Sequence, residues 1–359
     1  AWQMKLHVLC KLGRWEEALK TAEASAERLP DDASLRELRE WVKQQVRRTA
    51  EDHTLMLRDG RRLGYIDIGD PNGAVILGCH GTPGSRLDFA QEDALLRSLG
   101  VRLIAPDRPG YGLSDFTRHS YLSWVDDAVE LMDSLGIERF AVLGVSGGGP
   151  YAAAVAYQIP DRVLRLGLCS SGTPLNTLRA WVHLHWLSWP SHIIARCVPY
   201  PLLKRMDDSI APRLRSDPET YYRLLMRFRV HWGEKTRLSK APIAPATLDA
   251  FAEGYRQGGA GPAWDTHLGV RAWGFASRHL SVETYLWHGS KDILASPAMA
   301  RVLARAIPNC HATIYPDEGH LVFYQHASEI LTTLAGAQAS TSSGTPAPTS
   351  AAASGAEAV

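Results

Sequence analysis

One serine in this sequence has neighbours that suit it for chemistry. Residues 144–148 read Gly-Val-Ser-Gly-Gly, which matches the pattern G-x-S-x-G. An apolar run over 140–145 precedes the serine, and a helical pattern over 150–157 follows it. A sharp turn between a strand and a helix lifts a serine hydroxyl clear of the backbone. The pattern therefore predicts that Ser146 is a nucleophile and that the amide of Gly147 lies at a helix N-terminus.

A serine hydroxyl is a weak nucleophile at neutral pH and needs a neighbouring base, which a carboxylate in turn orients. Among 14 histidines, His320 follows the last strand-like run and a polar turn, so we expect it on a loop at one edge of a sheet. Asp292 follows the strand-like run 282–287 and lies between the serine and the histidine in chain order, as this type of site requires. Asp317 and Glu318 are the competing acids, and their closeness to His320 in sequence favours turn or surface roles.

Acyl transfer also needs N–H donors aimed at the oxygen that becomes negative. Residues 80–85 read His-Gly-Thr-Pro-Gly-Ser and directly follow the strand-like run 74–79. We expect the backbone N–H of Thr82 to lie beside that of Gly147 and to form an oxyanion hole with it. His80 is interpreted as a residue that shapes this loop rather than as the catalytic base.

Short apolar runs alternate with helical patterns over residues 51–335, and this alternation predicts an α/β fold. Nearly continuous apolar runs are typical of strands that are buried on both faces of a mostly parallel sheet. The expected strands are 54–57, 62–68, 74–79, 101–105, 140–145, 163–169, 282–287 and 312–315, with a turn at Asp59–Gly60 between the first two. The expected helices between them are 88–99, 121–135 and 150–157.

A helical stretch over residues 174–278 interrupts this alternation and predicts a cap inserted over the carboxyl edge of the sheet. The cap carries 15 Lys and Arg residues against 8 Asp and Glu, a net charge of +7. A solvated helical surface is the first interpretation of this charge, and attraction of an anionic substrate is the alternative. An apolar cluster at the start of the cap could pack on the core or bind an acyl group; it comprises Trp181, Trp186, Trp189, Ile193 and Ile194.

The two ends of the chain differ from the centre. Residues 1–50 predict a helical hairpin that resembles one tetratricopeptide repeat, with a turn at Gly13 and an end near Pro30. These helices could bind a protein partner, and a plain helical hairpin is the alternative. Residues 336–359 are almost wholly Ala, Ser, Thr, Gly and Pro, which predicts a disordered tail.

Five segments resemble, in their order, the motifs of the α/β-hydrolase superfamily: 80–85, 107–115, 144–150, 289–292 and 319–320. The likeness covers about residues 51–335. It implies an α/β-hydrolase fold, a mostly parallel sheet flanked by helices, with a triad of Ser146, Asp292 and His320 and an oxyanion loop at Thr82. Haloalkane dehalogenases and epoxide hydrolases are similar in layout but use an aspartate nucleophile, so Ser146 disfavours both chemistries. Prolyl aminopeptidases have a similar His-Gly-Gly-Pro-Gly loop, from which Thr82 departs.

These features together predict a cofactor-free serine hydrolase that forms an acyl-enzyme. The first expectation is a carboxylesterase that acts on an ester with a small to medium apolar acyl group. Carbon–carbon bond hydrolysis and aminopeptidase activity remain open alternatives within the same fold. A non-catalytic binding scaffold is the alternative from another class, because fold alone does not fix function.

Composition excludes several other classes of protein. The 359 residues include 39 Lys and Arg, 38 Asp and Glu and 45% hydrophobic residues, which excludes wholesale disorder and fibrous repeats. No apolar stretch of about 18 residues predicts a membrane span, and no nucleic-acid motif accompanies the basic residues. The pair His183 and His185 lacks a third ligand, so no metal site is expected. The lack of any C-x-x-C argues against a disulfide framework and for a cytoplasmic setting; the cysteines are Cys10, Cys79, Cys169, Cys197 and Cys310.

Overall fold

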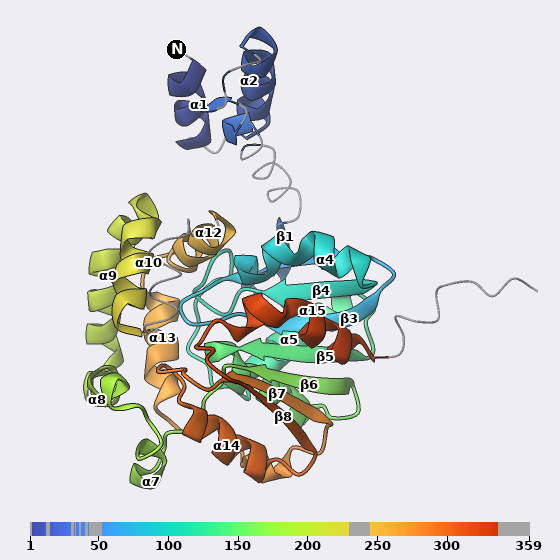
Figure 1. The fold of residues 1–359 in the computed structure, drawn as a ribbon, viewed down its shortest axis with the longest axis vertical. Coiled ribbons are helices and arrows are strands. Elements are labelled where there is room, and N and C mark those ends of the chain that lie inside the picture. The colour runs from blue at the N-terminus through green and yellow to red at the C-terminus, as the bar shows by residue number, and fades with distance from the viewer. Residues whose placement is uncertain are drawn as a thin grey trace, which may run out of the picture.

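A computed structural model shows an eight-stranded sheet with helices on both of its faces (Figure 1). It describes residues 2–11, 15–29, 32, 34–35, 37–39, 42, 52–229 and 245–336. The expected tail 336–359 lies outside the described residues except for its first residue. The strand order is β1-β2-β4-β3-β5-β6-β7-β8.

The sheet is mostly parallel, as the sequence predicted. Strands β3 to β8 run parallel to one another, whereas β2 is antiparallel to both β1 and β4. The turn between β1 and β2 includes Gly60 at φ +85°, which glycine adopts without steric cost. The strands are β1 (Asp52–Met56), β2 (Arg62–Gly69), β3 (Ala74–Cys79), β4 (Val101–Pro106), β5 (Phe140–Val145), β6 (Val163–Cys169), β7 (Thr284–Gly289) and β8 (Cys310–Tyr315).

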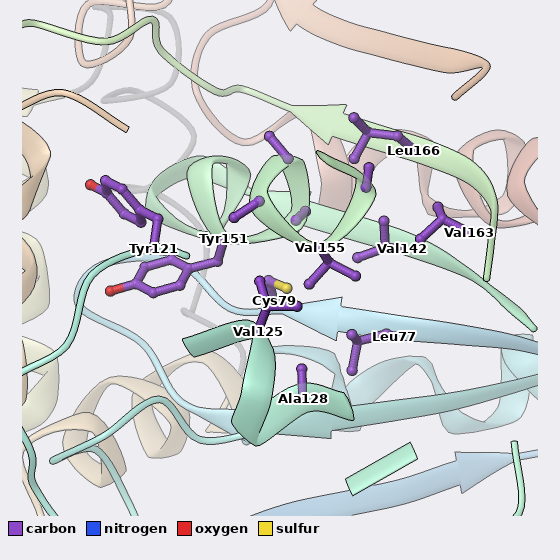
Figure 2. Packing of buried hydrophobic residues seen from close by; sticks show 14 of the residues in the cluster. Leu77, Cys79, Tyr121, Val125, Ala128, Val142, Tyr151, Val155, Val163 and Leu166 are labelled. Carbon is purple, nitrogen blue, oxygen red and sulfur yellow. The ribbon is translucent and has the colours of Figure 1, made fainter. Parts of the chain in front are cut away.

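Two buried layers lie on opposite faces of this sheet because alternate side chains of a strand point to opposite sides. On one face Leu77 and Val142 pack under helices α5 (Trp124–Ser134), α6 (Gly149–Gln158) and α14 (Pro297–Ala306). On the other face Ile76 and its neighbours pack under α4 (Asp93–Ser98) and α15 (Val322–Ala335). Figure 2 shows Tyr121 and Tyr151 side by side at the end of the first layer, with their hydroxyls directed away from it.

The segment after the oxyanion loop differs from the single helix expected over 88–99. It forms a 3₁₀ turn, Arg86–Glu92, and then the short helix α4. Two side chains here bond backbone groups elsewhere in the chain. Asp88 accepts the Gly81 N–H at 2.9 Å, and Ser85 donates to the carbonyl of Ala250 at 3.0 Å. These contacts tie the segment to the loop and to the inserted helices, so a regular helix does not begin until Asp93.

Helices inserted between β6 and β7 occupy the region expected as the cap, and they are called the cap below. Helix α13 packs against α9, and α12 packs against both α10 and the 86–92 turn. Residues 230–244 lie outside the described part of the chain. The cap helices are α7 (Leu178–Trp181), α8 (Trp189–Cys197), α9 (Tyr200–Ser216), α10 (Pro218–Arg229), α12 (Pro245–Gly254) and α13 (Ala260–Gly269).

The N-terminal segment contains two helices, α1 (Trp2–Lys11) and α2 (Trp15–Arg28). They pack together through small and aliphatic side chains, among them Leu6, Ala18 and Ala22, all of them fully buried. Two packed helices therefore lie within the segment that was expected to form a hairpin. Its likeness to a tetratricopeptide repeat and its role in binding a partner stay predictions.

Candidate active site

Ser146 lies immediately after β5 in a strained backbone conformation. Its φ is +52°, a left-handed value that residues with a side chain rarely adopt. A 3₁₀ turn, Ser146–Gly148, follows and leads directly into α6. Glycines permit this turn, because a Cβ on Gly144 would lie 2.7 Å from the carbonyl oxygen of Gly148. The expected strand, turn and helix are thus present, and they lift the serine to the carboxyl end of β5.

His320 lies between Ser146 and Asp292, although 174 residues separate it from the serine in sequence. Its Nε2 is 2.8 Å from Ser146 Oγ, and its Nδ1 is 2.8 Å from Asp292 Oδ2. The loop between β8 and α15 carries the histidine, whose side chain is only 10% exposed. The structure therefore brings together the three residues that the sequence had singled out as nucleophile, base and acid.

Asp292 lies on the loop after β7, and its side chain is fully buried. Its Oδ1 accepts the backbone N–H groups of Leu294 at 2.8 Å and Ala295 at 3.1 Å. Such bonds suit an ionised carboxylate, which can only accept. The proton on the histidine therefore lies on Nδ1, and Nε2 is left free to accept from the serine hydroxyl.

His288, at the end of β7, is a further neighbour of Asp292 that the sequence analysis did not single out. Its Nε2 lies 2.7 Å from the carbonyl oxygen of Ala295 and 3.3 Å from Asp292 Oδ2. Burial lowers the pKa of His288 below its ordinary value. A neutral His288 ring with its proton on Nε2 donates to the loop that carries Asp292 and stabilises it without adding a charge.

The competing acids lie elsewhere. Asp317 is 80% exposed and pairs with Lys291 at 2.5 Å, on the surface of the turn before His320. Glu318 lies 3.4 Å from His326 Nε2. Among the three candidate acids, Asp292 is the one that the structure places against His320 Nδ1.

The two expected oxyanion donors are neighbours in space. The nitrogen of Thr82 would lie 3.3 Å from a Cβ placed on Gly147, and the Thr82 Cβ only 2.8 Å from it. A side chain at position 147 would therefore press on the Thr82 side chain. The loop after β3 and the turn after β5 thus present their backbones to the same space, as expected for an oxyanion hole.

His80 lies behind the oxyanion loop and is fully buried. Its Nε2 accepts the backbone N–H of Arg108 at 3.1 Å, and its Nδ1 is 2.9 Å from the carbonyl oxygen of Gly81. Burial, assisted by the nearby Arg108 charge, holds the pKa of His80 well below its ordinary value. This geometry fits the interpretation of His80 as a residue that shapes the loop.

Two cavities meet at Ser146 and His320, and both residues line each of them. The larger has a volume of about 240 Å³ and lies between the sheet edge and helices α8 and α13; its apolar lining includes Tyr121, Leu175, Ala195, Val270 and Trp273. The smaller has about 80 Å³ and is lined by Val145, Phe251, Phe323 and Tyr324, together with the carboxyl of Asp88. Burial raises the pKa of Asp88 to about 6.

A buried ion pair that the sequence analysis missed joins the cap to this site. Arg108 Nη2 lies 2.6 Å from Asp265 Oδ2, and both side chains are almost completely buried. Arg108 belongs to the 107–115 motif, which had served only as a sign of the fold. Asp265 lies in α13 among Gly, Pro, Ala and Trp. A carboxylate in such an uncharged stretch was the one sequence signal that could have pointed to a buried ion pair.

Within the described residues, no group of three or more His, Cys, Asp or Glu side chains could hold a metal ion. In the same part of the chain, no helix is both long and apolar enough to cross a membrane.

Comparison with known proteins agrees with this fold. Residues 74–195 match the family described as "alpha/beta hydrolase fold". A 2-hydroxymuconate semialdehyde hydrolase from Pseudomonas putida is 28% identical over 280 residues, which are 76% of this chain and 89% of that protein. Haloalkane dehalogenase 2 from Mycobacterium tuberculosis (strain ATCC 25618 / H37Rv) is 36% identical over 150 residues, which are 40% of this chain and 49% of that protein.

Solved structures share the fold at low sequence identity. An enol-lactonase from Burkholderia xenovorans LB400 aligns with a TM-score of 0.57 and 21% identity, covering 78% of this chain and 97% of the other. An esterase from Exiguobacterium antarcticum aligns with a TM-score of 0.58 and 20% identity over the same shares. The solved structures share the α/β-hydrolase fold of this chain, and the family match over residues 74–195 agrees with it. They also support a hydrolase of this fold.

Proposed function

We propose that this chain is a serine hydrolase with Ser146, His320 and Asp292 as its catalytic triad and the amides of Thr82 and Gly147 as its oxyanion hole. One observation carries the proposal. The His320 ring lies 2.8 Å from the serine hydroxyl on one side and 2.8 Å from the buried carboxylate on the other. This arrangement gives a serine the base that it needs and gives that base its orientation.

The reaction would proceed through an acyl-enzyme. Ser146 Oγ attacks the acyl carbon while His320 Nε2 takes its proton, and the oxygen of the tetrahedral intermediate accepts from the two amides. His320 then returns the proton to the leaving oxygen, and an alcohol departs. Water deprotonated by His320 attacks the acyl-enzyme and releases the acid. Asp292 stays ionised and stabilises the imidazolium that forms in each step.

We propose a carboxylic ester with a small to medium apolar acyl group as the substrate. The two cavities that meet at Ser146 suit an ester, whose acyl and alcohol parts extend to opposite sides of the reacting carbon. The aromatic and aliphatic lining of the larger cavity supports an apolar acyl group there. In the larger cavity an N-terminal ammonium would need a free carboxylate, and Asp265, the carboxylate described in its lining, already pairs with Arg108. The aminopeptidase alternative is therefore less well supported.

Carbon–carbon bond hydrolysis is the second candidate. It is favoured by the similarity to the 2-hydroxymuconate semialdehyde hydrolase from Pseudomonas putida, which extends over 89% of that protein. A dehalogenase reaction is not proposed, because Ser146 stands where the dehalogenase resemblance implies an aspartate nucleophile.

Covalent labelling tests the nucleophile. A fluorophosphonate probe should label the purified chain at Ser146, and Ser146→Ala should abolish both labelling and turnover. Labelling that persists in this variant would refute the assignment.

A substrate panel separates the remaining functions. It should contain p-nitrophenyl esters of two to eight acyl carbons, an amino acid p-nitroanilide and a vinylogous 1,5-diketone. Ester turnover that exceeds the other two is the expected result. Turnover of the diketone alone would select the carbon–carbon hydrolase. No labelling and no turnover would favour the binding scaffold.

A further inference from the structure

Asp265 of cap helix α13 accepts five hydrogen bonds, although its side chain is only 4% exposed. Its Oδ2 accepts from Arg108 Nε at 2.9 Å, Arg108 Nη2 at 2.6 Å, Thr82 Oγ1 at 2.9 Å and the Tyr111 hydroxyl at 2.9 Å, and its Oδ1 accepts from the Tyr151 hydroxyl at 2.6 Å. Although burial alone would raise it, the Arg108 guanidinium holds the pKa of Asp265 below its ordinary value. Asp265 is therefore a buried, fully bonded carboxylate.

Arg108 links Asp265 to the oxyanion loop. Its Nη2 donates to the Thr82 hydroxyl at 2.8 Å and to the carbonyl oxygen of Gly81 at 2.8 Å, and its Nη1 donates to the carbonyl of His80. The His80 ring adds a second bond to the Gly81 oxygen. Because its Nε2 accepts from a backbone N–H, its proton lies on Nδ1, which donates to that oxygen at 2.9 Å.

The Gly81 oxygen and the Thr82 N–H belong to the same peptide unit. A trans peptide is planar, and its C=O and N–H point in opposite directions. Bonds that hold the Gly81 oxygen toward Arg108 and His80 therefore fix the direction of the Thr82 N–H. That nitrogen is the one that would lie 3.3 Å from a Cβ on Gly147, on the side of the proposed oxyanion hole.

We propose that Asp265 is a positioning residue for the oxyanion hole, which holds the Thr82 amide in its working direction through Arg108 and the Thr82 hydroxyl. This inference rests on the proposed function of the site. Asp265 comes from the cap, and 183 residues separate it from Thr82. The hole is thus complete only while α13 is packed on the oxyanion loop, and the cap contributes to the chemistry as well as to the cavity wall.

The central variant is Asp265→Asn, which keeps the shape of the side chain but removes the charge that pairs with Arg108. Asp208→Asn is the matched control. Asp208 also stabilises α13, because it accepts the Gly259 N–H at 2.8 Å, but it bonds Lys204 rather than the oxyanion loop. Thr82→Val is a milder second variant, which removes the hydroxyl bond to Asp265 and leaves the backbone amide in place.

Hydrogen exchange gives a readout that needs no substrate. In Asp265→Asn, the amides of a peptide spanning residues 78–85 should exchange at least about tenfold faster than in the unmodified chain, since a tenfold change is a modest loss of local stability. The same peptide in Asp208→Asn should exchange as in the unmodified chain. Unchanged exchange of this peptide in a folded Asp265→Asn would overturn the proposal. If that variant fails to fold, the same comparison is made on Thr82→Val.

An ester and its thionoester report on the hole itself, because sulfur is a weak hydrogen-bond acceptor and gains little from the amides. Loss of one oxyanion donor costs about 10²–10³ in kcat, so Asp265→Asn should lose about 10² in kcat on the ester with little change in KM. It should lose much less on the thionoester, and Thr82→Val should show the same trend.

A purely structural role would lower turnover of both substrates equally, and that result would overturn the proposal. Failure of the proposed function is distinguishable from this outcome. In that case the unmodified chain would turn over neither substrate, whereas the exchange measurement would still decide whether Asp265 holds the loop.

Discussion

Ser146 is placed by the strain and space of a few neighbouring residues. A left-handed conformation at a residue with a side chain costs about 1–3 kcal/mol and persists only where the surroundings enforce it. Here the close contact of Gly144 with Gly148 and the fully buried α6 residues Ala152 and Ala153 hold the turn. The Ser146 hydroxyl therefore points to His320, and the packing around the turn offsets the cost of the strained backbone at Ser146.

Asp292→Asn tests the assignment of the acid. The amide cannot hold the required tautomer of His320, and the comparable change in serine proteases lowers kcat by about 10⁴. Ester turnover should fall by about that factor while Tm changes little. Asp317→Asn is the matched control and should retain near-normal turnover, because Asp317 pairs with Lys291 at the surface. The reverse pattern would move the acid to Asp317.

Asp88→Asn tests the effect of burial on a carboxyl. The pKa of Asp88 is raised from 3.8 to about 6, so the folded state binds its proton more tightly than the unfolded state. Stability therefore falls as pH rises from about 4 to 6, by up to about 3 kcal/mol. Asn can still accept the Gly81 N–H without a charge. Tm of the variant should exceed that of the unmodified chain at pH 8 and equal it near pH 4.

Asp126→Asn, an exposed change on α5, serves as the control and should leave the pH dependence of Tm unaltered. Parallel curves of Tm against pH for the unmodified chain and Asp88→Asn would show that burial does not act on Asp88 as stated.

Several elements are held together by one buried arginine rather than by apolar packing alone. Arg86, with a side chain only 1% exposed, pairs with Asp107 after β4 at 2.7 Å, Asp52 of β1 at 2.7 Å and Glu253 of α12 at 2.8 Å. A buried charge is tolerated only when it is paired. Arg86 thereby fixes the sheet edge and a cap helix at the segment that follows the oxyanion loop.

Arg86→Ala should cost about 3–5 kcal/mol of unfolding free energy, because it leaves the fully buried Asp107 without its partner. Chemical denaturation measures this loss. Arg97→Ala removes an exposed pair with Asp93 within α4 and should shift Tm by no more than about 2 °C. Equal effects of the two changes would contradict a special role for the buried arginine.

At the scale of the whole molecule, the described cap cations lie outside the two cavities at Ser146. Several cap cations pair with acids close to them in sequence, as Arg223 does with Glu219 and Lys204 with Asp208. Within the described residues, neither Lys nor Arg lines either of the two cavities at Ser146. The structure favours the first interpretation of the +7 charge, a solvated helical surface.

We therefore expect salt to affect charged and neutral substrates alike. Values of kcat/KM for an anionic ester and a neutral ester of the same acyl length should respond equally between 0.05 and 0.5 M salt, at ionic strengths where screening removes long-range steering. A selective fall for the anionic ester would show that the cap does attract it, and Arg196→Gln and Arg205→Gln would then identify the source.

Local patterns in the sequence were sufficient to predict the fold class and the residues that follow its strands. Ser146, Asp292 and His320 were predicted because each lies on the loop or turn that follows a recognisable strand, and parallel strands end at a common edge. The single helix expected over 88–99 was wrong, because residues 86–92 form a 3₁₀ turn in which Asp88 and Ser85 also bond groups elsewhere in the chain.

The sequence by itself determined the succession of strands along the chain, the glycine turn at Ser146 and the loop of Thr82, since these depend on neighbours within a few residues. Only the tertiary structure decided that His288 stabilises Asp292 and that Asp265 reaches Thr82 across 183 residues. No periodic pattern encodes such contacts. They depend on where folding brings distant segments together, and a buried charge takes its partner from whatever lies beside it there.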